Sequence, residues 1–206
     1  SVYSLTCTDA GIPARGVEYA LRAAELSKEL EFDLGLAAAL ANMTAALHAM
    51  GLYRETVSLS LRVIRKFKGQ NSFAEPVFVA RSNLASAALS LRQFTLAAEA
   101  AKEACEPLAA PSNRHQALNR VATEIVWLKS AIELNDHESI TARVSAIRAL
   151  AKSYPFPRLQ LNEKIAEAAY DLYDGRPQDA LATLHAALVL SKAVPGVYRD
   201  TLTLLI

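Results

Sequence analysis

A similar stretch of sequence recurs at nearly constant intervals along the chain, and this repetition constrains the possible folds more than any other feature. Residues 175–188 read GRPQDALATLHAAL and residues 11–24 read GIPARGVEYALRAA, so both begin Gly-x-Pro and carry a small residue five places after the glycine. The equivalent turn positions are evenly spaced and fall at Gly11, Gly51, Arg92, Asn135 and Gly175. Self-similarity at a fixed period indicates a stacked repeat architecture.

A stripe of mostly small side chains follows each turn. Residues five, nine and twelve places after the turn lie on one face of a helix, because residues three or four apart are neighbours on a helical surface. In the last repeat these residues are Ala180, Leu184 and Ala187. Because these side chains are small, a second helix can approach closely.

A second helical stretch precedes the turns. The expected helices cover about 34–51, 73–92, 112–134 and 157–174, and breaker clusters stand at 68–76, 109–113, 154–157 and 194–196. Gly51 and Gly175 stand where the end of a helix requires a left-handed residue, and Pro13 and Pro177 suit the first turn of the next helix. No segment shows the sustained period-two alternation of a strand. The sequence therefore predicts an all-α chain of helical hairpins.

The hairpins are predicted to stack, because a lone hairpin cannot bury its apolar stripe whereas neighbouring hairpins bury it together. We expect one domain over 1–206 with about five repeats of roughly 41 residues. The expected units are a partial repeat at 1–33, repeats at about 34–70, 71–111, 112–155 and 156–194, and the start of a further helix at 195–206. The chain begins with Ser and stops inside the apolar run TLTLLI, so we expect truncation at both ends.

Composition and charge narrow the class of protein. Apolar residues make up 52% and charged residues 21%, which favours a packed core, and the net charge of +1 is spread without a basic cluster. We therefore expect no nucleic-acid binding by this segment. Two cysteines without a CxxC pair or a secretory signal indicate a cytoplasmic location. The uncharged stretch 34–53 is mostly alanine, so we interpret it as a buried helix and expect no membrane association.

The sequence carries no recognisable catalytic motif, and we expect no enzyme activity, no cofactor and no metal. It contains no GxSxG, no glycine-rich phosphate loop and no HExxH, and its four histidines are scattered. Asp171 and Asp174 alternate with Tyr170 and Tyr173, a pattern compatible with acid–base chemistry but more typical of a polar helix end. The alternative to a non-enzymatic role is an α-helical enzyme with an unrecognised active site.

Two of the repeats resemble the tetratricopeptide repeat (TPR). Residues 41–63 (ANMTAALHAMGLYRETVSLSLRV) and 82–104 (SNLASAALSLRQFTLAAEAAKEA) share Asn-Met or Asn-Leu in the first helix and Gly-x-Tyr or Arg-x-Phe at the turn. Their period is longer than the TPR period of about 34 residues. Positions usually occupied by Trp, Gly and Tyr are mostly Ala, Leu and Thr. The resemblance implies a right-handed superhelix of antiparallel helix pairs, that is, a TPR-like α-solenoid.

The same resemblance implies a binding surface. In TPR superhelices the first helix of each pair lines a concave groove that receives a protein or peptide partner. Asn42 and Asn83 stand nine residues before their turns. In some TPR families an asparagine at this place binds the backbone of a peptide, since its amide donates and accepts hydrogen bonds. The alternative is that each asparagine bonds to a neighbouring helix.

Further candidate groove residues follow Asn83 at helical spacing or lie beside it. They are Arg81, Ser82, Ser86 and Ser90, of which Ser86 and Ser90 are equally explained as small packing residues. Later repeats place Val126 and Ala166 at the corresponding position, so the polar row does not continue.

Long, degenerate repeats of this kind look like those of bacterial signalling proteins, in which a TPR superhelix adjoins a diguanylate cyclase or a transcription-regulator module. We therefore expect a non-catalytic protein-interaction or sensory domain that regulates an attached output module. The alternative is an oligomerisation scaffold without a ligand. The apolar terminal stripes at 2–10 and 197–206 predict a concentration-dependent homodimer in either case.

Overall fold

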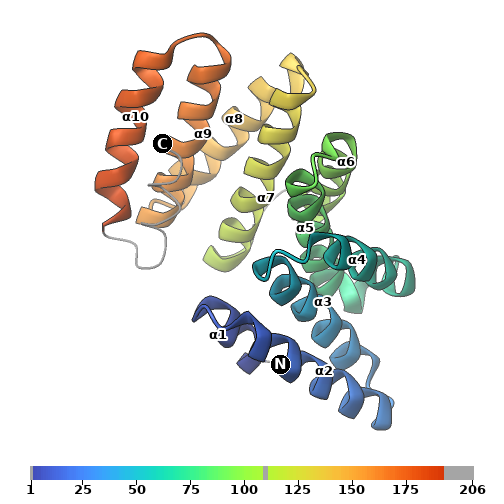
Figure 1. Cartoon of the computed structure of the whole chain (residues 1–206). Helices are drawn as coiled ribbons and strands as arrows, with labels where there is room; N and C mark the ends of the chain where they lie inside the picture. The colour runs from blue at the N-terminus through green and yellow to red at the C-terminus, as the bar shows by residue number, and fades with distance from the viewer. Residues whose placement is uncertain (1, 109–110, 193–206) are drawn as a thin grey trace. The chain divides into compact units, whose positions relative to one another are not determined.

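The computed structural model describes residues 2–108 and 111–192, and its regular secondary structure there is entirely helical (Figure 1). The α-helices are α1 (Val2–Asp9), α2 (Pro13–Glu29), α3 (Asp33–Ala49), α4 (Tyr53–Phe67), α5 (Ala74–Ser90), α6 (Phe94–Cys105), α7 (Arg114–Glu133), α8 (His137–Ser153), α9 (Pro157–Tyr173) and α10 (Pro177–Ser191). Short 3-10 turns, η1 (Asn71–Phe73) and η2 (Glu106–Leu108), precede α5 and follow α6.

The predicted helical class is confirmed. The four expected first helices correspond to α3, α5, α7 and α9, with ends that differ by no more than two residues. The predicted helix at 195–206 and the terminal stripe at 197–206 lie outside the described residues.

Helices pack mostly with their neighbours in sequence, and the chain divides into two compact units, residues 1–104 and 105–206. In the first unit, α2 packs on α3 and α4 on α5; in the second, α7 packs on α8 and α9 on α10 (Figure 1). Alternate helices also touch, since α3 contacts both α1 and α5, and α7 contacts α9. This pattern is consistent with a helical repeat array, in which each pair packs mainly on the next.

The repeated turn positions form one kind of corner. Gly11, Gly51, Arg92, Asn135 and Gly175 all have positive φ angles, between 56° and 76°. At Gly51 the backbone N–H donates to the carbonyl of His48 (2.9 Å), and the next N–H donates to the carbonyl of Leu47 (3.0 Å). The other four corners repeat these two bonds, which define the Schellman motif and satisfy the last carbonyls of the first helix.

The stripes that follow the corners are buried, as their periodicity predicts. Five residues after the corner stand Gly16, Thr56, Ala97, Ile140 and Ala180, and all five are buried. The small size of Gly16 is required by contact: a Cβ there would lie 2.7 Å from the Thr8 hydroxyl oxygen and 3.0 Å from the carbonyl oxygen of Ser4. Helices α1 and α2 therefore meet through backbone, and the Ser4 hydroxyl donates to the Gly16 carbonyl (2.7 Å).

The corners allow a direct test of backbone strain. Replacing Arg92 with glycine is expected to raise the free energy of unfolding by about 0.5–1 kcal/mol, because the left-handed conformation costs a residue with a Cβ roughly 1–2 kcal/mol. Replacing Gly51 with alanine is expected to lower it by about 1 kcal/mol. At Gly51 no atom lies within 4 Å of the position of the added Cβ, so packing does not contribute to that change. Arg92 is exposed, and its guanidinium carbon lies 5.7 Å from the centroid of the Phe94 ring. Urea unfolding followed by circular dichroism measures both changes, and a loss of stability in Arg92→Gly equal to that in Gly51→Ala would contradict this account.

Each unit has its own apolar core. In the first unit Val63 and Phe67 of α4 pack with Leu36 of α3, Phe73 of η1 and Val77 of α5. In the second unit the core is centred on α7, α8 and α9 and includes Leu128, Ile147 and Leu159, which are fully buried. These cores fix the spacing of the helices and therefore the distances between the polar side chains on them.

Candidate functional site

Helices α3 and α5 carry all six predicted groove residues. Asn42 lies on α3, and Arg81, Ser82, Asn83, Ser86 and Ser90 lie on α5. The amide nitrogen of Asn83 donates to the hydroxyl oxygen of Thr44 on α3 at 2.8 Å, and Thr44 is fully buried. Asn83 therefore links the two first helices, as in the alternative in which the asparagine bonds to a neighbouring helix. Asn42 is half-buried.

The serines of α5 bond along their own helix. The hydroxyl of Ser86 donates to the carbonyl of Ser82 and that of Ser90 donates to the carbonyl of Ser86, both at 3.0 Å. Each hydroxyl keeps lone pairs with which it can accept a further hydrogen bond. Ser90 is exposed, whereas Ser82 and Ser86 are half-buried, so the row becomes more accessible toward the end of α5.

Arg81 joins α5 to α6. Its guanidinium lies 3.0 Å from the carboxylate of Glu103 and also donates to the Glu103 carbonyl at 3.3 Å. The Arg81 side chain is largely buried. The structure thus brings the predicted residues onto two contacting helices and gives Arg81 and Asn83 internal partners. Binding of a peptide by these residues stays a prediction.

A buried ionic network lies in the second unit and was not predicted from the sequence. The carboxylate of Glu124 on α7 is fully buried and lies 2.8 Å from the guanidinium of Arg120 and 3.0 Å from that of Arg143 on α8. Arg143 stacks on the ring of Trp127, with 3.8 Å between the guanidinium carbon and the ring centroid. Arg120 also donates to the carbonyl of Cys105 at 3.0 Å. A signal was present in the sequence: Glu124 interrupts an apolar run and follows Arg120 by one helical turn.

Cys105 lies beside this network and is buried. Burial, together with the negative charge of Glu124, raises the pKa of the Cys105 thiol to about 12. The thiol is therefore protonated near neutral pH and is a poor nucleophile. Cys105 therefore acts as a small packing residue beside the network.

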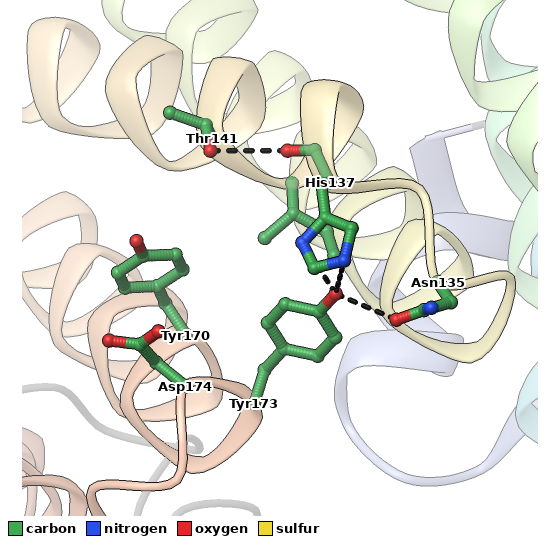
Figure 2. Close-up of a pocket in the computed structure, with 7 residues that line it drawn as sticks. Asn135, His137, Thr141, Tyr170, Tyr173 and Asp174 are labelled. Atoms are coloured by element: carbon green, nitrogen blue, oxygen red, sulfur yellow. Dashed lines mark hydrogen bonds between the residues drawn. The ribbon is translucent and has the colours of Figure 1, made fainter.

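A pocket of about 350 Å³ opens between α8 and α9 (Figure 2). It is lined by Asn135, His137, Ile140, Thr141, Tyr170, Tyr173 and Asp174. Figure 2 shows His137, Asn135 and Tyr173 meeting on one side, with Tyr170 and Asp174 on the other. The corner at Asn135 and the end of α9 position these groups, so the repeat geometry itself forms the pocket.

Hydrogen bonds fix one wall of this pocket. The Tyr173 hydroxyl donates to Oδ1 of Asn135 at 2.7 Å and lies about 3 Å from the ring nitrogens of His137. The rings of His137 and Tyr173 meet edge to face, with centroids 5.3 Å apart. Asp136 caps α8 by accepting from the backbone N–H of Ser139, and hydrogen bonds from the Ser139 side chain and backbone lower the pKa of the Asp136 carboxyl group. The sequence singled out Tyr170, Tyr173 and Asp174 but did not bring them together with His137.

Over residues 2–108 and 111–192, His, Cys, Asp and Glu side chains form no group of three or more that is placed to hold a metal ion. Over the same ranges, none of the helices combines the length and apolar character that crossing a membrane requires.

Comparisons of the chain with models of known protein families, with curated proteins and with solved structures gave no match. Its function is therefore inferred from its own residues and their arrangement.

Proposed function

We propose that this chain is a non-catalytic protein-interaction or sensory module that regulates an attached output module, of the diguanylate cyclase or transcription-regulator type, in a bacterial signalling protein. The helix pairs of each unit would stack as in a right-handed TPR-like superhelix, and a protein or peptide partner would bind along the first helices. The observation that carries the proposal is the packing of α3 on α5, which places the half-buried Asn42 and the exposed Ser90 on two contacting helices. A partner that contacts both helices senses their separation, and small changes at each junction add along a stacked array.

A specific observation supports the alternative of an assembly scaffold. The corner between α2 and α3 exposes four large apolar side chains close together in sequence, namely Leu26, Leu30, Phe32 and Leu34. Leu30 is 74% exposed and Phe32 is 53% exposed. Clustered exposed apolar residues are typical of protein–protein contacts, so this corner favours self-association.

Photo-crosslinking distinguishes the two functions. A photoreactive phenylalanine analogue is placed at Asn42 or at Ser90 in the full-length protein in its native cell, and a matched variant carries it at Arg62, an exposed residue of α4. Partner binding along the first helices predicts crosslinks to a different protein from Asn42 and Ser90 but not from Arg62. Crosslinks only to a second copy of the chain would favour the scaffold, and equal yields from all three positions would contradict binding on α3 and α5.

A further inference from the structure

We propose that the pocket between α8 and α9, walled by Tyr170, Tyr173 and His137 and edged by Asp174, binds an organic ammonium group. This site lies wholly in the second unit, and the proposal does not depend on a partner at α3 and α5. Three features of the pocket support it: its charge, the helix ends that meet there and its aromatic walls.

The charge around the pocket favours a cation. Two segments that border it, 135–138 and 171–179, carry five carboxylates and one guanidinium. The carboxylates are Asp136, Glu138, Asp171, Asp174 and Asp179, and the guanidinium is Arg176. Arg176 pairs with Asp171, Asp174 and Asp179 at 2.7, 2.9 and 3.5 Å, which leaves the region with excess negative charge. Asp174 is the charged side chain that lines the pocket, and the excess of negative charge around it concentrates ligands of positive charge.

The helix ends that border the pocket also favour a positively charged ligand. Helix α7 ends just before Asn135 and α9 ends at Tyr173, so two helix C-termini, the negative ends of their dipoles, border the pocket. Helix α8 begins here as well, but its positive end is met by the Asp136 cap and by Glu138 in its first turn. The balance of fixed charges and dipoles therefore stabilises a positive ligand.

The aromatic rings select an organic cation rather than a metal ion. The chain itself contains such a contact between a cation and an aromatic ring. The guanidinium of Arg176 lies over the ring of Tyr170, 5.8 Å from the centroid. Aromatic faces attract ammonium and guanidinium groups, and quaternary ammonium ligands are commonly bound by such rings. The neighbouring carboxylates converge on Arg176, and the described residues include no group suited to metal coordination. A volume of about 350 Å³ suits a small molecule or one side chain.

Titration followed by amide NMR tests the proposal on the whole chain. The probes are choline, its neutral isostere 3,3-dimethylbutan-1-ol and Nα-acetyl-lysine amide, each at millimolar concentration. Choline is expected to shift signals of residues 135–141 and 170–174, whereas the neutral alcohol is expected to leave them unchanged. Equal shifts from choline and the alcohol, or no shift from either ammonium compound, would overturn the proposal.

Nα-acetyl-lysine amide distinguishes a lysine side chain from a free small amine as the source of the ammonium group. Tighter binding of the lysine derivative than of choline indicates a lysine side chain of a peptide, and the reverse order indicates a free small amine. Both outcomes support ammonium recognition.

Two variants and a matched control locate the site. Tyr170→Leu is expected to weaken binding by about tenfold, because an aromatic face is lost. Asp174→Asn, at an exposed position, is expected to weaken it by about fivefold without affecting folding. Asp179→Asn removes an equal charge that does not line the pocket and is expected to have a smaller effect. Equal losses in Asp174→Asn and Asp179→Asn would show that general charge, not this pocket, attracts the ligand.

Discussion

Replacing Glu124 with alanine is expected to lower the free energy of unfolding of the second unit by about 3–5 kcal/mol. The physical reason is that Glu124 is fully buried between Arg120 and Arg143, whose side chains are only 13% and 17% exposed. Without the carboxylate, two largely buried positive charges face each other and lack their shared acceptor. A surface ion pair would cost far less, because water solvates the charge that remains.

The protein contains the probe and the control for this measurement. Trp127 is the only tryptophan of the chain and stacks on Arg143, so its fluorescence reports unfolding around the network. Arg148→Ala is the matched control, because Arg148 also pairs with a carboxylate, that of Glu167, but its side chain is 56% exposed. Arg148→Ala is expected to lower the free energy of unfolding by less than about 1 kcal/mol. Equal shifts of the urea midpoint in Glu124→Ala and Arg148→Ala would show that burial does not strengthen the network.

Replacing Phe67 with alanine is expected to lower the free energy of unfolding of the first unit by about 3–5 kcal/mol, a typical cost for truncating a buried phenylalanine. Phe67 is buried at the end of α4 and stacks on Phe73, with ring centroids 4.9 Å apart. The lost ring leaves a cavity where α4 meets η1 and α5, and these elements cannot collapse into it without moving a helix end.

Urea unfolding followed by circular dichroism measures the effect, with an expected drop of the midpoint by about 2 M. Leu61→Ala on the same helix is the control, because Leu61 is 41% exposed, and it is expected to change stability by less than about 1 kcal/mol. Phe67→Leu, which keeps most of the apolar volume, is expected to fall between the two. A Phe67→Ala variant no less stable than Leu61→Ala would contradict the assigned core.

Much of the helical architecture could be predicted from the sequence, because the signals involved are local. The nearly constant repeat period placed five corners. Gly51 and Gly175 have the left-handed conformation expected of them, and Gly11 adopts it as well. Arg92 and Asn135 were assigned to the same role by spacing alone, and they adopt it. A sixth corner of this kind, at Glu31 between α2 and α3, was missed. Its residue type carries no turn signal, so only the packing of α2 on α3 imposes it.

The polar sites were less predictable, because they depend on which helix faces lie next to each other. Asn83 was singled out for a peptide, and the structure shows its bond to Thr44, a residue 39 positions away. Tyr173 was noted beside Asp174, and His137 was counted only among the scattered histidines. Their contact spans 36 residues and exists only because two helix pairs stack. Likewise, the sequence showed Arg120 and Glu124 on one helix but not Arg143 on the next.

The sequence by itself determined the helices, five of their corners and the buried stripes of this protein, because backbone propensity and apolar periodicity act over a few residues. Only the tertiary structure decided which charges are buried, which side chains pair between helices and where a pocket opens. Those properties depend on the distance between residues that are far apart in sequence, and packing sets that distance.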